Sequence, residues 1–200
     1  MTSADRAAIA SLVQDWAVFR DAGDFDRLRD IWAPDGKTNA TWFSGTADEF
    51  VARSRAMFGA PVPGALHELY GTSVDVRGDR AVSQTKMAIV LRTTVHGTEC
   101  EIKCAGRFYD LWQKLGDAWK LAQRFVIYER DRLEPLDGAP YPKLDAAVLA
   151  SFPPGYRHLA YAQQADGASV IGGLPGLTGP AVEALYATGR EWLASPPLSH

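Results

Sequence analysis

The feature of the sequence that most restricts its fold is a series of four long runs in which apolar and polar residues alternate. The runs cover residues 66–76, 80–95, 99–114 and 118–133, and β-branched and aromatic residues are frequent in them. Three residues separate each run from the next, and each of these short gaps contains a glycine. Gaps of this length form hairpin turns, so the sequence predicts four consecutive antiparallel strands.

Three helices are predicted ahead of these strands. The spacing of apolar residues predicts a long helix that ends at Gly23 and a short helix that follows Asp24. A strand is expected near residues 37–43, and a capping box of Thr46 and Glu49 then begins the third helix. Helices followed by a meander of strands predict an α+β fold, in which N-terminal helices pack on one face of a curved antiparallel sheet.

The composition changes after the last predicted strand, where proline and glycine become frequent. This change divides the chain into a domain of residues 1–134 and an extension of residues 135–200. A terminal helix is predicted from Pro180 through Trp192, since proline is favoured in the first turn. Because residues such as Tyr156 are too apolar for a free tail, the extension is expected to pack on the domain or on a partner subunit.

The charge pattern excludes several classes of partner. The formal net charge of −3 is spread along the chain, and the absence of a basic run argues against binding of nucleic acid. No apolar stretch approaches the roughly 20 residues that cross a bilayer, so no membrane partner is expected. The first residues also lack the order of charged and apolar segments that defines a signal peptide, and a cytoplasmic protein is therefore expected.

Motifs for cofactors and metals are also missing from the sequence. There is no glycine-rich phosphate loop, no Gly-x-Ser-x-Gly turn and no zinc spacing, so neither a cofactor nor a metal is expected. Cys100 and Cys104 lie four residues apart on one predicted strand, too far apart for an easy disulfide. They are interpreted as small residues that line the core or a pocket.

Three polar residues occupy positions that are unfavourable for them. Asp21 falls in the last turn of the first helix, where the helix dipole disfavours a carboxylate. His67 lies among apolar neighbours at the start of the first meander strand, and an imidazole is well suited to act as a general base. Arg124 shares a strand face with apolar residues, and either pairs with an acid such as Glu129 or Asp110 or holds a polar group of a ligand. Structural roles remain open for all three at this point.

The sequence resembles the SnoaL-like branch of the nuclear transport factor 2-like superfamily over roughly residues 5–134. The resemblance is carried by residues 12–21 of the first helix, by the segments 25–32 and 67–71, by the turn at 78–81 and by residues 116–120. It implies a cystatin-like fold, a cone-shaped α+β barrel of helices and a curved sheet. A cone of this kind encloses a pocket for a small apolar molecule.

Within this superfamily the chain is most similar to the scytalone dehydratases, bile-acid 7-alpha-dehydratases and lindane dehydrochlorinases. These enzymes perform cofactor-free eliminations with a pair of aspartate and histidine. Asp21 falls on the family's aspartate and His67 on its histidine. The resemblance therefore implies that Asp21 orients the imidazole of His67, which removes a proton from the substrate.

This resemblance leads to a hypothesis of a cofactor-free lyase or isomerase that acts on a small, largely apolar carbonyl-bearing or cyclic substrate. Trp16 departs from the family pattern, because the dehydratases have a tyrosine there. Arg124, whose place matches the family arginine only weakly, or a pocket tyrosine such as Tyr70 or Tyr128 would stabilise the developing oxyanion. Trp16 and Phe19 would line the pocket.

A second hypothesis is that the domain has no chemistry of its own. The superfamily also contains binding domains and dioxygenase β-subunits, so the chain is alternatively a non-catalytic domain for small-ligand binding or subunit association. Family relatives commonly pair through the open face of the sheet. The resemblance therefore also implies a homodimer.

Overall fold

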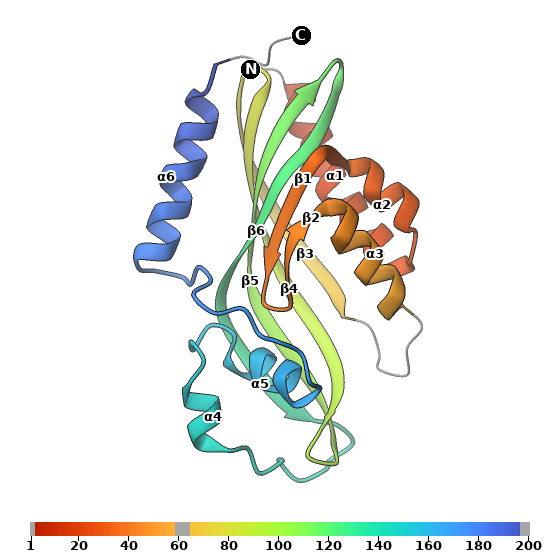
Figure 1. Cartoon of the computed structure of the whole chain (residues 1–200), viewed down its shortest axis with the longest axis vertical. Coiled ribbons are helices and arrows are strands. Elements are labelled where there is room, and N and C mark those ends of the chain that lie inside the picture. Colours follow the sequence, from red (N-terminus) through yellow and green to blue (C-terminus); the bar gives the residue numbers. More distant parts are fainter. Residues whose placement is uncertain (1–2, 59–64, 197–200) are drawn as a thin grey trace.

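A curved six-stranded sheet with helices on both faces forms the centre of the structure (Figure 1). The structure is a computed structural model that describes residues 3–58 and 65–196. Proline and glycine are frequent in residues 59–64, which predicts a loop, and this segment lies outside the described residues.

The four strands of the predicted meander are confirmed. They are β3 (Leu66–Arg77), β4 (Arg80–Val95), β5 (Thr98–Leu115) and β6 (Ala118–Pro135). Each pairs with the next in the antiparallel direction. The glycines of the three turns, Gly78, Gly97 and Gly116, all have positive φ. Glycine adopts this conformation without strain, so the turn residues fix the strand pairing that the alternation predicts.

The other two strands make the sheet mixed, whereas the expected sheet was antiparallel throughout. In place of one strand near 37–43, the chain forms β1 (Trp32–Ala40) and β2 (Phe43–Thr46). β1 pairs with β2 in the antiparallel direction but with β6 in the parallel direction. The strand order is β2-β1-β6-β5-β4-β3, so β2 and β3 are free edges and the sheet does not close into a barrel.

The three predicted N-terminal helices are confirmed and lie together on one face of the sheet (Figure 1). They are α1 (Ser3–Ala22), α2 (Phe25–Ile31) and α3 (Ala47–Met57). The capping box that begins α3 is present, with Thr46 and Glu49 bonding each other's backbone N–H groups. Ile9, Val13 and Trp16 of α1 are buried against the sheet, as their spacing predicts.

The extension contains the helices α4 (Ala146–Ala150), α5 (Arg157–Ala165) and α6 (Pro180–Ala194). It packs on the sheet of its own chain. α5 lies at the end of the sheet below the N-terminal helices (Figure 1). Asp131 of β6 holds it there by accepting hydrogen bonds from the backbone N–H groups of His158 and Leu159, at 2.6 and 2.9 Å. The imidazole Nδ1 of His158 contacts the other oxygen of Asp131 at 2.9 Å.

α6 lies on the opposite face of the sheet from the N-terminal helices (Figure 1). Its residues Val182 and Leu185 form a second apolar cluster with Tyr109 of β5 and Ile127 of β6. The homodimer implied by the resemblance uses the open face of the sheet, and α6 packs on part of that face. Among the helices of residues 3–58 and 65–196, none is both long and apolar enough to cross a membrane.

Gly106 of β5 provides a test of the sheet packing. A Cβ atom at this position would lie 2.0 Å from the carbonyl oxygen of Ile127 on β6, so the strands would have to move apart. We expect Gly106→Ala to lower the free energy of unfolding by about 1–3 kcal/mol, measured by urea denaturation.

The matched control is Gly71→Ala on the edge strand β3, where nothing lies within 4 Å of the added Cβ. Its stability should stay within about 0.5 kcal/mol of the parent chain. Equal stabilities of the two variants would contradict the close approach of β5 and β6.

Candidate active site

A cavity of about 670 Å³ lies between the N-terminal helices and the sheet. Its lining is mostly aromatic and aliphatic, with contributions from Trp16, Trp42, Phe50, Phe58, Ile89, Leu91, Phe108 and Val126. Leu159 and Gln163 of α5 also line it, so the extension contributes to the cavity wall. A cavity of this size and character suits a small organic molecule with an apolar body.

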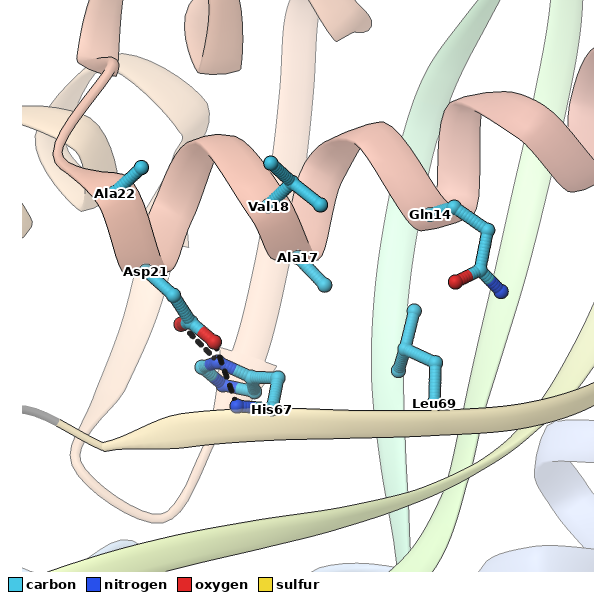
Figure 2. Close-up of a pocket in the computed structure, with 7 residues that line it drawn as sticks. All are labelled: Gln14, Ala17, Val18, Asp21, Ala22, His67 and Leu69. Atoms are coloured by element: carbon cyan, nitrogen blue, oxygen red, sulfur yellow. Dashed lines mark hydrogen bonds and ion pairs between the residues drawn. The ribbon is translucent and has the colours of Figure 1, made fainter.

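Asp21 and His67 meet in the wall of this cavity. Asp21 ends α1 and His67 begins β3, and the two side chains point toward each other (Figure 2). One carboxylate oxygen of Asp21 accepts a hydrogen bond from the backbone N–H of His67 at 2.7 Å. The other lies 2.7 Å from the imidazole Nδ1. The carboxylate therefore fixes the ring, and the sequence prediction that these residues lie together agrees with their placement.

The contact with Asp21 also defines the tautomer of His67. A carboxylate accepts hydrogen bonds, so Nδ1 carries the proton and Nε2 is the basic nitrogen. Nε2 has no hydrogen-bond partner among the described residues. The rings of His67 and Trp16 are nearly perpendicular, with 5.2 Å between their centroids. The arrangement presents one basic nitrogen beside an aromatic surface.

The pair separates the cavity from a second, outer groove of about 410 Å³. Figure 2 shows this groove, which is lined by Gln14, Ala17, Val18, Asp21, Ala22, His67 and Leu69. The side chain of His67 is 9% exposed and that of Asp21 is 17% exposed. The carboxylate is thus the more accessible member of the pair.

Arg124 of β6 forms a buried ion pair with Asp110, which lies opposite it on β5. Its Nε and one Nη donate to the two oxygens of Asp110, both at 2.7 Å. The guanidinium lies 4.1 Å from the ring centre of Trp16 and 4.0 Å from that of Phe108. Its other amino group, Nη1, has no hydrogen-bond partner among residues 3–58 and 65–196, and Arg124 lines the cavity. Arg124 is therefore both a structural partner of Asp110 and a donor with free capacity.

Tyr128 lies further along β6, on the same strand face as Arg124. Its hydroxyl oxygen accepts a hydrogen bond from the backbone N–H of Thr41 at 3.1 Å. Burial raises the pKa of the Tyr128 phenol well above its usual range, so the O–H remains protonated. The hydroxyl hydrogen has no acceptor among the described residues, and Tyr128 lines the cavity. It is a second hydrogen-bond donor for a bound molecule.

Tyr70 and Phe19 do not line the cavity, contrary to the sequence prediction. Tyr70 lies three residues after His67 on β3, beside an irregularity in the strand pairing, and it is exposed to solvent. There its hydroxyl donates to Glu68 at 2.6 Å. Phe19 instead faces α2, where the guanidinium of Arg27 lies 4.0 Å from its ring centre.

Other polar residues in the cavity wall were not identified from the sequence. Ser54 of α3 and Gln163 of α5 each have a buried side-chain oxygen without a partner in the described part of the chain. Ser54 follows Phe50 by four residues on one helix face, and that spacing could have placed it in the cavity. Gln163 lies in the extension, where no periodic pattern relates the residues to the sheet.

The described part of the chain contains no group of three or more His, Cys, Asp or Glu side chains that could hold a metal ion. Cys100 and Cys104 are free thiols and are fully buried. Burial raises the pKa of the Cys104 thiol well above its ordinary value, so this side chain remains neutral.

Comparison with known proteins shows the family and its extent. The model of the SnoaL-like domain matches residues 1–124. The chain is 32% identical to a PEP2-like protein of Fusarium vanettenii, over 94% of this chain and 85% of that protein. It is 31% identical to Pea pathogenicity protein 2 of the same fungus, over 86% of this chain and 75% of that protein. Matches of this length include residues of the extension as well as the domain.

Solved structures establish the fold. One is a scytalone dehydratase candidate of Novosphingobium aromaticivorans (17% identity, TM-score 0.55), covering 67% of this chain and 94% of that one. A second is a hexachlorocyclohexane dehydrochlorinase of Novosphingobium barchaimii (19% identity, TM-score 0.53), covering 70% of this chain and 96% of that one. A third is a protein of Nostoc punctiforme with a cystatin-like fold (18% identity, TM-score 0.52), covering 70% of this chain and 97% of that one. The cystatin-like fold expected from the sequence is therefore confirmed.

The buried pair of Arg124 and Asp110 provides a test of this site. Removing one partner leaves a buried charge without compensation, which costs about 3–5 kcal/mol. We expect Asp110→Ala to lower the free energy of unfolding by that amount in urea denaturation.

The double variant Asp110→Leu with Arg124→Met removes both charges and keeps apolar volume. It should recover most of the lost stability, because burial of an unpaired charge no longer occurs. A double variant as unstable as Asp110→Ala would show that the loss arises from packing rather than from charge.

Proposed function

The chain belongs to the SnoaL-like domain family, and we propose that it is a cofactor-free lyase or isomerase. Its substrate is a small, largely apolar molecule with a carbonyl group or a ring, bound in the cavity. The observation that carries this proposal is the fixed imidazole of His67, whose Nε2 has no hydrogen-bond partner among the described residues while Asp21 holds Nδ1.

In the proposed reaction His67 is the general base. Its Nε2 removes a proton from the carbon next to the substrate carbonyl, and the ring becomes an imidazolium. Asp21 stabilises that positive charge and keeps the ring oriented, as a carboxylate does for histidine bases in general. Because both oxygens of Asp21 are already bonded to His67, the ring needs little reorganisation when the proton arrives.

Arg124 and Tyr128 would stabilise the negative charge that develops on the carbonyl oxygen. Each lines the cavity and has an unused donor, Nη1 of Arg124 and the O–H of Tyr128. The ion pair with Asp110 fixes the guanidinium in advance, so the donor is held in place before a substrate binds.

The proposed elimination then balances without an added reagent. The electron pair of the broken C–H bond forms the new double bond, and a leaving group departs from the adjacent carbon. When that group is a hydroxyl, the imidazolium of His67 returns its proton and water leaves. In an isomerisation, the same proton returns to a different carbon. Two proteins of this fold are named for eliminations, a dehydratase candidate and a dehydrochlorinase, which supports this reaction type.

Proton abstraction can be tested without knowledge of the natural substrate. Tetralone, a small bicyclic aryl ketone, exchanges the hydrogens next to its carbonyl with deuterium oxide, and NMR measures the rate. We expect the protein to accelerate this exchange. His67→Ala should reduce the acceleration about 10²–10⁴-fold, the usual contribution of a general base. Asp21→Asn should also reduce it, while both variants still bind the ketone.

The chain contains a matched control in His158→Ala. His158 also contacts an aspartate through Nδ1, but it does not line the cavity. This variant should exchange tetralone at the parent rate. A parent protein no faster than free imidazole, or one unaffected by His67→Ala, would instead support the non-catalytic binding domain.

A further inference from the structure

The charged residues of the cavity wall indicate the charge of the ligand, which the proposed base and oxyanion donors do not specify. Three arginines line the cavity, Arg20, Arg53 and Arg124, and two acids, Asp21 and Asp166. Arg124 is neutralised by Asp110. The remaining two arginines and two acids have formal charges that sum to zero, so the preference of the cavity depends on which of them already have hydrogen-bond partners.

Both acids are already engaged by other groups. The two oxygens of Asp21 contact the backbone N–H and the imidazole of His67. Asp166, at the end of α5, accepts a hydrogen bond from the Thr93 hydroxyl at 3.2 Å. Neither acid forms an ion pair with a cavity arginine within 4.0 Å.

Arg20 lies in the last turn of α1, one helical turn after Trp16, and it is partly buried. Its guanidinium has no ion pair or hydrogen bond with any side chain of residues 3–58 and 65–196. Burial lowers the pKa of Arg20, and the nearby charge of Asp21 only partly offsets this effect. A partly desolvated guanidinium without a partner is unfavourable, and an anion bound beside it would remove that cost.

Arg53 supplies a second positive charge from α3. Its guanidinium lies 5.9 Å from the ring centre of Trp42, and it too has no acidic partner among the described residues. Trp42 packs against Phe50 with 5.6 Å between centroids, and both rings line the cavity. The cavity therefore combines aromatic walls with two arginines, the partly buried Arg20 and the exposed Arg53, neither of which forms an ion pair with a described residue.

We propose that the ligand of this cavity is an amphipathic anion, with an aromatic or polycyclic body against the aromatic walls and a carboxylate or similar acidic group at Arg20 and Arg53. An amphipathic anion is thus the substrate class of the proposed enzyme. The inference rests on the proposed function only in that the substrate and the anion occupy the same cavity. The acidic group binds at Arg20 and Arg53, while the reacting part of the molecule lies at His67.

Two fluorescent probes test the charge preference. Anilinonaphthalene sulfonate and N-phenylnaphthylamine have the same rings, and only the first carries an anionic group. We expect the full-length chain to bind the sulfonate roughly tenfold more tightly than the neutral probe, as one charge-assisted contact allows. Arg20→Gln should weaken the sulfonate about tenfold. The neutral probe should bind with little change.

Three further variants separate charge from structure. Arg20→Lys retains the positive charge and should retain most of the preference for the sulfonate. Arg53→Gln should weaken the sulfonate selectively. Arg6→Gln removes an exposed arginine from the same helix, outside the cavity, and should change neither probe.

The inference is overturned if both probes bind equally well, if Arg20→Gln weakens both alike, or if Arg6→Gln has the same effect as Arg20→Gln. These outcomes are independent of the tetralone exchange. If His67→Ala abolishes the exchange but the parent chain binds both probes equally, the proposed function is supported and the anionic ligand is contradicted. A charge preference without exchange would support an anion-binding domain that performs no reaction.

Discussion

The ion pair between Arg124 and Asp110 is the interaction on which the rest of the structure depends. It joins β5 and β6 at the centre of the sheet, with both side chains almost fully buried. The faces of the guanidinium contact the rings of Trp16 and Phe108, so the pair also provides the surface on which α1 packs. A charge buried this deeply is tolerated only beside its partner. The ion pair therefore restricts the register of β5 with β6 and the position of α1 on them.

Asp21 and His67 continue this arrangement at the edge of the sheet. The bond to the backbone N–H of His67 uses a donor on β3 that no neighbouring strand can bind, because β3 is an edge strand. The same aspartate therefore attaches α1 to the sheet and orients the imidazole. A residue with both roles explains why a carboxylate occupies the end of a helix, where the dipole disfavours it.

The sequence predicted the parts of the structure that local patterns encode. Alternation and the glycine turns located β3 to β6, and helical spacing located α1 to α3. Contacts between distant segments had no such signal, as in the parallel pairing of β1 with β6 and the contribution of Gln163 to the cavity. Asp21 and His67 were placed together through the family resemblance, since 46 residues separate them. The prediction for Tyr70 is wrong because an aromatic residue in a strand does not by itself show which face it occupies, and the irregular pairing of β3 at this point has no signal in the sequence.

Because of the position of α5, the size of the cavity and the position of the His67 imidazole depend on different elements of the chain. The proposed base lies on β3 and its carboxylate partner on α1, whereas α5, which also lines the cavity, follows the last strand of the sheet. Side chains on α5 can thus be exchanged for larger or smaller ones without moving the imidazole. Relatives that also carry the extension can therefore differ in the size of molecule that the cavity accepts through this one helix, while the imidazole of His67 keeps its position.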